Sequence, residues 1–125
     1  MRLLLDTNAF LRWIAGGRVP RSVERVMRRR DTECVVSVVT GWETTMKPKL
    51  GLNARDFEAA LSKISAALLP IKFKHLDELS RLPSYEDHRD PFDRMLIAQA
   101  LAEGLAVITS DGRFADYRPL QVIWD

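Results

Sequence analysis

Short apolar runs alternate with longer amphipathic stretches along this chain, and no other feature constrains its fold as strongly. The runs that we expect to be strands are residues 3–5, 34–38, 70–73, 106–109 and 120–123. Most are β-branched or continuously apolar, which is typical of strands buried on both faces of a sheet. Because helical patterns separate them, we predict an α/β fold with a mainly parallel central sheet and helices on both faces.

The stretches between these runs carry the spacing and the end signals of helices. We expect helices over residues 9–15, 20–30, 40–47, 54–68, 77–82 and 91–103, and a short helical piece at 113–116. The helix at 91–103 has the clearest limits, because Pro91 occupies its first position and Gly104 follows its last. A length of 125 residues leaves room for one domain, which we place over residues 1–125.

The composition excludes several classes of protein. Hydrophobic residues make up 46% of the chain, which is enough apolar surface to offset chain entropy and to exclude intrinsic disorder. The single cysteine, Cys34, excludes an internal disulfide and a cysteine-based metal cluster, and we expect it in the core of a cytoplasmic protein. No segment reaches the roughly 20 apolar residues that span a bilayer, so we expect no membrane association.

The formal net charge of +2 conceals an uneven distribution. Residues 1–30 hold eight arginines and two acidic residues, whereas the remaining 95 hold 11 basic and 15 acidic ones. The net value alone predicts neither a strong nucleic-acid binder nor an acidic tail. The distribution is more informative, because it predicts a basic first quarter and an acidic remainder.

Two acidic residues follow predicted strands. Asp6 comes directly after the run at 3–5, and Asp111 comes shortly after the run at 106–109. Sites in open parallel sheets lie beyond the carboxyl ends of the strands, so both positions suit chemistry. Each also has a simpler explanation, since aspartate commonly caps the helix that follows it.

Two further acids, Glu43 and Asp93, lie on or at the starts of predicted helices. Glu43 alone fits a solvated helix face, and Asp93 fits the first turn of a helix that Asp90 caps. Together with Asp6 and Asp111, however, they would gather at one edge of the sheet. Four carboxylates there repel one another unless a cation lies between them, and oxygen ligands suit Mg²⁺ or Mn²⁺.

Zinc does not fit this pattern, because it prefers cysteine and histidine ligands at regular spacing. The chain offers only Cys34, His75 and His88, and their spacing matches no zinc motif. We expect His75 at the surface, near the start of a helix. We expect His88 to orient the loop before Asp93, without a catalytic role.

Four blocks of sequence carry these acids: residues 3–8 (LLLDTN), 37–43 (SVVTGWE), 88–100 (HRDPFDRMLIAQA) and 107–111 (VITSD). In this order and at these distances, they resemble the PIN-domain ribonuclease family, and within it the VapC-type toxins of toxin–antitoxin pairs. The resemblance covers essentially the whole chain. It implies a single PIN-like domain and a Mg²⁺-dependent endoribonuclease that hydrolyses RNA phosphodiester bonds.

The resemblance also assigns roles to individual residues. The acidic quartet that holds the metal in such nucleases matches Asp6, Glu43, Asp93 and Asp111, and the polar residues that support it match Thr7, Asn8, Thr109 and Ser110. Asp116 lies near a fifth acid of some relatives, at a loose spacing that a surface helix also explains. Asn8 departs from the family, because many of these toxins have histidine there. The family further implies a homodimer and a cognate antitoxin whose tail would occupy the acidic groove.

For the reaction we expect attack by a metal-bound water, with Glu43 or Asp111 as the proton acceptor. An acidic site repels RNA, so basic residues must surround it. The candidates for RNA contact are Lys47, Arg94 and Arg12. Arginine faces on helices are also commonly solvated, and they can equally meet an acidic antitoxin.

Other interpretations remain open at this point. A phosphatase of the haloacid dehalogenase type needs a second aspartate two residues after the first, where Asn8 stands. A receiver domain needs an acidic pair before Asp6 and a late strand-end lysine, and neither is evident. A catalytically inactive PIN-fold module that binds RNA or protein is the third alternative, and the presence of all four acids disfavours it.

Overall fold

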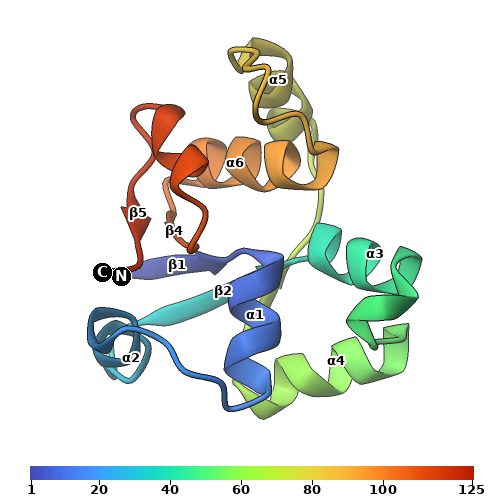
Figure 1. The fold of residues 1–125 in the computed structure, drawn as a ribbon, viewed down its shortest axis with the longest axis vertical. Coiled ribbons are helices and arrows are strands. Elements are labelled where there is room, and N and C mark those ends of the chain that lie inside the picture. Colours follow the sequence, from blue (N-terminus) through green and yellow to red (C-terminus); the bar gives the residue numbers. More distant parts are fainter.

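The computed structural model describes residues 1–125 (Figure 1), and five parallel strands form its centre. They are β1 (Arg2–Leu5), β2 (Glu33–Ser37), β3 (Ala67–Leu69), β4 (Ala106–Ile108) and β5 (Val122–Ile123). Their order across the sheet is β3-β2-β1-β4-β5, and every neighbouring pair is parallel. The predicted α/β fold with a parallel sheet is therefore confirmed.

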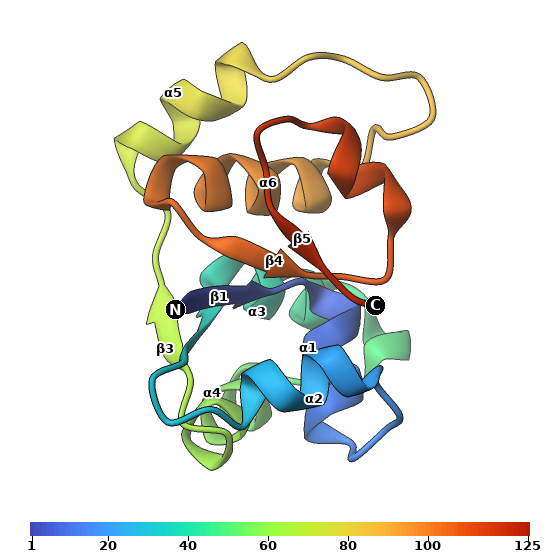
Figure 2. The same cartoon turned by 90° about the vertical axis from the view of Figure 1, so that its left-hand side faces the viewer.

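Helices cover both faces of this sheet (Figure 2). One face carries α1 (Thr7–Ile14), α2 (Arg21–Met27) and α4 (Ala54–Lys63), and the other carries α5 (Phe73–Arg81) and α6 (Pro91–Glu103). The helix α3 (Val38–Met46) begins where β2 ends and contacts α6 as well as α1 and α4. Short 3₁₀ turns, η1 (Pro48–Leu50) and η2 (Gly112–Asp116), follow α3 and β4. None of the helices has the length and apolar character needed to cross a membrane.

The sheet separates two hydrophobic cores, because successive side chains of a strand point to opposite faces. On β1, Leu4 packs with residues of α6, whereas Leu3 and Leu5 pack with residues of α1 and α4. All three leucines are inaccessible to solvent. Cys34 is buried in the second core, as predicted. Burial on both faces explains why the strands are continuous apolar runs.

The segment after α4 departs from the prediction. The helix expected over 54–68 ends at Lys63, and Ser65 adopts a positive φ of 55° that a right-handed helix cannot contain. Strand β3 then occupies Ala67–Leu69 instead of the predicted 70–73, and Phe73 already begins α5. The apolar residues before Pro70 fit helical and strand spacing equally well, so the pattern alone misplaces this boundary.

The limits of α6 match the prediction at both ends. The Asp90 carboxylate accepts hydrogen bonds from the backbone N–H groups of Phe92 and Asp93, so it caps the helix. Gly104 ends the helix in the left-handed conformation, at a φ of 69°, which costs glycine little. By contrast, α2 ends at Met27, short of the expected residue 30.

His75 is fully buried, contrary to the predicted surface position. Its Nδ1 accepts a hydrogen bond of 2.9 Å from the backbone N–H of Lys72, and its Nε2 lies 2.7 Å from the Glu103 carboxylate. The Lys74 ammonium pairs with the same carboxylate at 2.9 Å. Lys74 and His75 together lower the pKa of Glu103 to about 2. This polar group ties the start of α5 to the end of α6.

The order of the strands reverses between β1 and β4. From β1 the chain passes to β2 and β3 on one side, and it later returns to β4 and β5 on the other. The carboxyl ends of β1 and β4 therefore lie at the topological switch point of the sheet. Parallel sheets commonly place their binding sites at such a point.

Candidate metal centre

A polar cavity of about 280 Å³ lies at the carboxyl ends of β1 and β4. Its lining consists of Asp6, Thr7, Asn8, Glu43, Lys47, Leu50, Asp90, Asp93, Asp111 and Arg113. The four carboxylates singled out in the sequence thus come from four separate segments and line one cavity. Their segments are the ends of β1 and β4, the middle of α3 and the first turn of α6.

Asp6 lines this cavity and comes directly after β1. One of its carboxylate oxygens accepts a hydrogen bond of 2.8 Å from the backbone N–H of Ala9, and so Asp6 caps α1. The other accepts a 2.6 Å hydrogen bond from the Thr109 hydroxyl. Burial raises the pKa of Asp6 above its usual range, and the charges of Asp111 and Glu43 add to that shift. The residue is therefore both a helix cap and a crowded carboxylate.

Glu43 is buried on α3 and faces two partners. Its Oε1 accepts a 2.6 Å hydrogen bond from the Thr7 hydroxyl, and its Oε2 pairs with the Lys47 ammonium at 2.7 Å. The Thr7 hydroxyl also lies 3.2 Å from that of Thr40. Glu43 consequently has a fixed orientation toward the cavity and is not a solvated residue of a helix face.

Asp93 lies one turn into α6, next to the capping residue Asp90. Its Oδ2 is 3.3 Å from Nε2 of His88. Burial raises the pKa of Asp93 to about 6, and the charge of Asp90 contributes to the increase. Burial and a neighbouring negative charge both disfavour the ionised carboxylate, and a nearby cation would favour it.

Asp111 follows β4 and caps the short turn η2. Arg113 binds both of its carboxylate oxygens, at 3.0 Å and 2.8 Å, and this pairing holds the pKa of Asp111 below its usual range. Arg113 also donates to the backbone carbonyl of Asp87, so it links this edge of the cavity to the loop before α6.

His88 is the residue that sequence reasoning undervalued. It is only 2% exposed, and its Nδ1 lies 3.0 Å from the Tyr117 hydroxyl. Its Nε2 and one oxygen each of Asp93 and Asp111 all lie within 4.8 Å of one another. The only signal in the sequence was its place in the loop before Asp93, since the contacts with Tyr117 and Asp111 join distant segments.

The donor set fits a divalent cation. Five carboxylates line the cavity, whereas only Lys47 and Arg113 bring positive charge to it. Burial is the main cause of the raised pKa values of Asp6 and Asp93, and the charges of neighbouring carboxylates add to it. Carboxylate oxygens are the ligands that Mg²⁺ and Mn²⁺ prefer in proteins.

Some of the remaining predicted residues line the acidic cavity, and others lie outside it. Lys47 and the exposed Asn8 line the cavity. Ser110 and Asp116 are exposed and do not line it. Arg94 belongs to a neighbouring cavity. Arg12 binds the Arg18 carbonyl and stacks on Trp124, away from the carboxylates.

Comparisons with known proteins agree with this architecture. The family model described as PIN domain matches residues 3–119. Among solved structures, VapBC2 from Rickettsia felis, bound to a DNA fragment from its promoter, aligns with a TM-score of 0.73 and 17% identity over 100% of both chains. VapBC-5 from Mycobacterium tuberculosis aligns with a TM-score of 0.65 and 21% identity, over 99% of this chain and 98% of that one. No curated protein matches the sequence.

Proposed function

Because the chain belongs to the PIN domain family, we propose that it is a metal-dependent endoribonuclease and the toxin of a toxin–antitoxin pair. One observation carries this proposal. A single cavity at the topological switch point between β1 and β4 is lined by Asp6, Glu43, Asp93 and Asp111. The choice of RNA over DNA rests on the family. A cytoplasmic location accords with the single free cysteine, Cys34.

The proposed reaction is hydrolysis of a phosphodiester bond. A Mg²⁺ or Mn²⁺ ion held by Asp6, Glu43, Asp93 and Asp111 would lower the pKa of a bound water and neutralise charge on the phosphate. The hydrogen bonds of Thr109 and Thr7 hold two of these carboxylates in place before any ligand arrives. Such preorganisation lowers the cost of assembling the site.

The proton of the attacking water needs an acceptor near the phosphate. Asp111 and Glu43 are the two candidates for this role, and each has a partner at both carboxylate oxygens. Arg113 pairs with Asp111 and holds its pKa low, whereas Thr7 and Lys47 orient Glu43. Lys47 lies at the same cavity and would face the phosphate of a bound strand.

Partners of the chain follow from the same proposal. The structural similarity to VapBC complexes supports a cognate antitoxin. A homodimer is supported by the apolar side chains of Val38, Trp42 and Met46, which are exposed at successive turns of α3. Coexpression with the product of the adjacent gene, followed by light scattering of the purified complex, tests both partners.

Cleavage of RNA by the purified protein tests the activity. The wild type should cut single-stranded RNA with Mg²⁺ or Mn²⁺ and lose this activity with EDTA. Asp93→Asn keeps the size of the side chain but removes a ligand charge, and should lower the rate roughly 100-fold or more. Asp56→Asn makes the same change at an exposed position on α4 and should leave the rate unchanged.

Three outcomes would contradict the proposal. Cleavage that persists in EDTA, or that is equally fast in Asp93→Asn, would exclude the metal mechanism. Binding of RNA by the wild type without cleavage in either metal would favour the alternative of an inactive PIN-fold binding module.

A further inference from the structure

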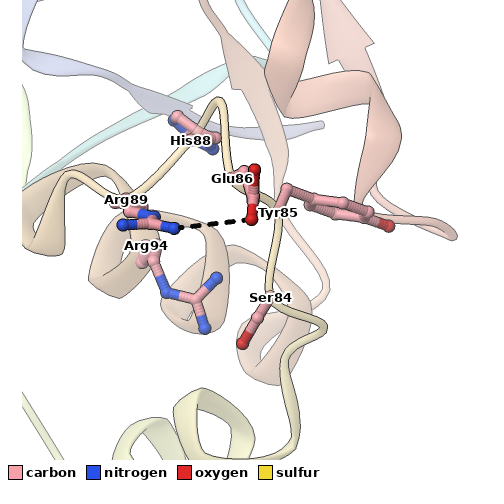
Figure 3. A pocket seen from close by; sticks show the side chains of 6 residues that line it. All are labelled: Ser84, Tyr85, Glu86, His88, Arg89 and Arg94. Atoms are coloured by element: carbon pink, nitrogen blue, oxygen red, sulfur yellow. Dashed lines mark ion pairs between the residues drawn. The ribbon is translucent and has the colours of Figure 1, made fainter.

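A second cavity, of about 570 Å³, has His88 in its lining (Figure 3), the residue that also lies close to Asp93 and Asp111. Its lining consists of Ser84, Tyr85, Glu86, His88, Arg89 and Arg94, and only one of these side chains is hydrophobic. In Figure 3 the ring of Tyr85 points away from the other labelled side chains. Two guanidinium groups therefore dominate the chemistry of this cavity.

Arg94 is held in a fixed position although it has no acidic partner. Its Nη1 donates to the Pro83 carbonyl at 2.8 Å and to the Tyr117 hydroxyl at 3.2 Å, and its guanidinium lies 5.9 Å from the centre of the Tyr117 ring. None of the ion pairs in the structure includes Arg94. A positioned and uncompensated guanidinium at a cavity is suited to binding an anion.

The second guanidinium is available as well. Arg89 lies 4.0 Å from Glu86, and the side chains are 75% and 96% exposed, respectively. Ion pairs so exposed contribute little and exchange readily for a better partner. An anion in the cavity can therefore engage Arg89 and Arg94 together.

His88 connects this cavity to the metal centre. The Tyr117 hydroxyl lies 3.0 Å from its Nδ1 and binds Arg94, while its Nε2 lies 3.3 Å from Asp93. Arg94 also directly follows Asp93 on α6. The carboxylates and the guanidinium groups thus lie on the two sides of one buried imidazole.

We propose that this cavity binds a phosphate of the RNA strand next to the one that is cleaved, with Arg94 as its main ligand and Arg89 as its second. The proposal rests on the proposed nuclease function. An acidic metal centre repels the flanking phosphates, so a strand needs a cation where it leaves that centre. Arginine suits this task because its planar fork matches the oxygens of a phosphate.

The salt dependence of RNA binding tests this assignment. In the Asp93→Asn background, where cleavage is blocked, the affinity for a labelled single-stranded RNA is measured by fluorescence anisotropy across KCl concentrations. Arg94→Gln should make the slope of log affinity against log salt shallower by about 0.7. Over a tenfold rise in salt, the affinity of the variant should therefore fall about fivefold less than that of its parent. Arg94→Lys should restore the slope, because it retains the charge.

Arg55→Gln is the matched control, since Arg55 is exposed on α4 at the opposite face of the sheet. If adding Arg94→Gln to Asp93→Asn leaves the salt slope unchanged while the wild type cleaves RNA, the phosphate site is wrong but the nuclease function stands. The phosphate site is also wrong if Arg94→Gln weakens antitoxin binding and leaves the RNA slope unchanged, which would assign the cavity to a protein partner. Absence of both RNA binding and cleavage in the parent proteins overturns the nuclease function together with the inference.

Discussion

At the scale of single residues, the two histidines show how far a side chain's role depends on distant partners. His75 and His88 are both buried, and each has both ring nitrogens close to a hydrogen-bonding partner. His75 stabilises the contact between α5 and α6. His88 instead orients Asp93 at the cavity, with Tyr117 holding the other side of its ring. The same residue type thus serves the fold at one position and the site at the other.

Replacement of His88 tests that difference. His88→Gln should raise the dissociation constant for Mn²⁺ roughly tenfold, because Asp93 loses the group that orients it. Isothermal titration calorimetry measures this constant. His75→Gln is the matched control, which should lower the melting temperature but leave Mn²⁺ binding unchanged. Equal Mn²⁺ affinity in wild type and His88→Gln would contradict a role for His88 at the metal centre.

At the scale of secondary structure, α6 is the element whose local signals and tertiary surroundings agree. Asp90 caps it, Pro91 occupies its first position and Gly104 ends it, so its limits follow from the sequence. The helix then presents Asp93 to the acidic cavity and Arg94 to the neighbouring one. The start of α6 therefore positions both proposed parts of the site.

Two substitutions of Asp90 separate its capping role from its charge. Asp90→Ala removes the acceptor of the N–H groups of Phe92 and Asp93, and should lower the free energy of unfolding by about 1 kcal/mol. Asp90→Asn keeps an acceptor oxygen and should be closer to wild type, although both variants remove the same charge. Urea denaturation measures the difference. Equal destabilisation of the two variants would show that charge, and not capping, dominates.

Other elements were less predictable. The helix expected over 54–68 ends early and the strand expected at 70–73 is displaced, because β3 forms by pairing with β2 rather than by local preference. The backbone of Ser65 and the pairing of Val35 with Ala67 decide where the helix stops and the strand begins. Propensity and periodicity do not contain that information.

At the scale of the whole molecule, the net charge of +2 is the sum of acidic and basic regions of the surface. Five carboxylates crowd one cavity, and guanidinium groups line the next. Without a cation, the repulsion among the carboxylates opposes folding. The thermal stability of the metal-free protein should therefore depend on pH.

The stability of the metal-free protein tests this expectation. Because the folded state raises the pKa of Asp93 from 3.8 to about 6, its contribution to stability is largest at low pH and is lost as the pH rises toward 6. Glu103 contributes with the opposite sign, since its pKa is lowered to about 2. The melting temperature of wild type minus that of Asp93→Asn isolates the Asp93 contribution. This difference should decline as the pH rises from about 4 to about 6, and Mn²⁺ should reverse the decline.

A difference that is constant across this pH range would contradict the raised pKa that burial and the neighbouring Asp90 give Asp93. A melting temperature that Mn²⁺ leaves unchanged at neutral pH would contradict a metal centre, since any ligand that binds only the folded state raises it.

The sequence by itself determined the alternation of strands and helices, the limits of α6 and the acids that follow β1 and β4. These features are local, because side-chain period, helix caps and strand ends are set by residues a few positions apart. Only the tertiary structure decided the partners of His88, the pairing of Asp111 with Arg113 and the position of β3. It also decided that Arg94 faces a cavity without an acidic partner. Those features join segments far apart in the chain, and packing rather than local preference brings such segments together.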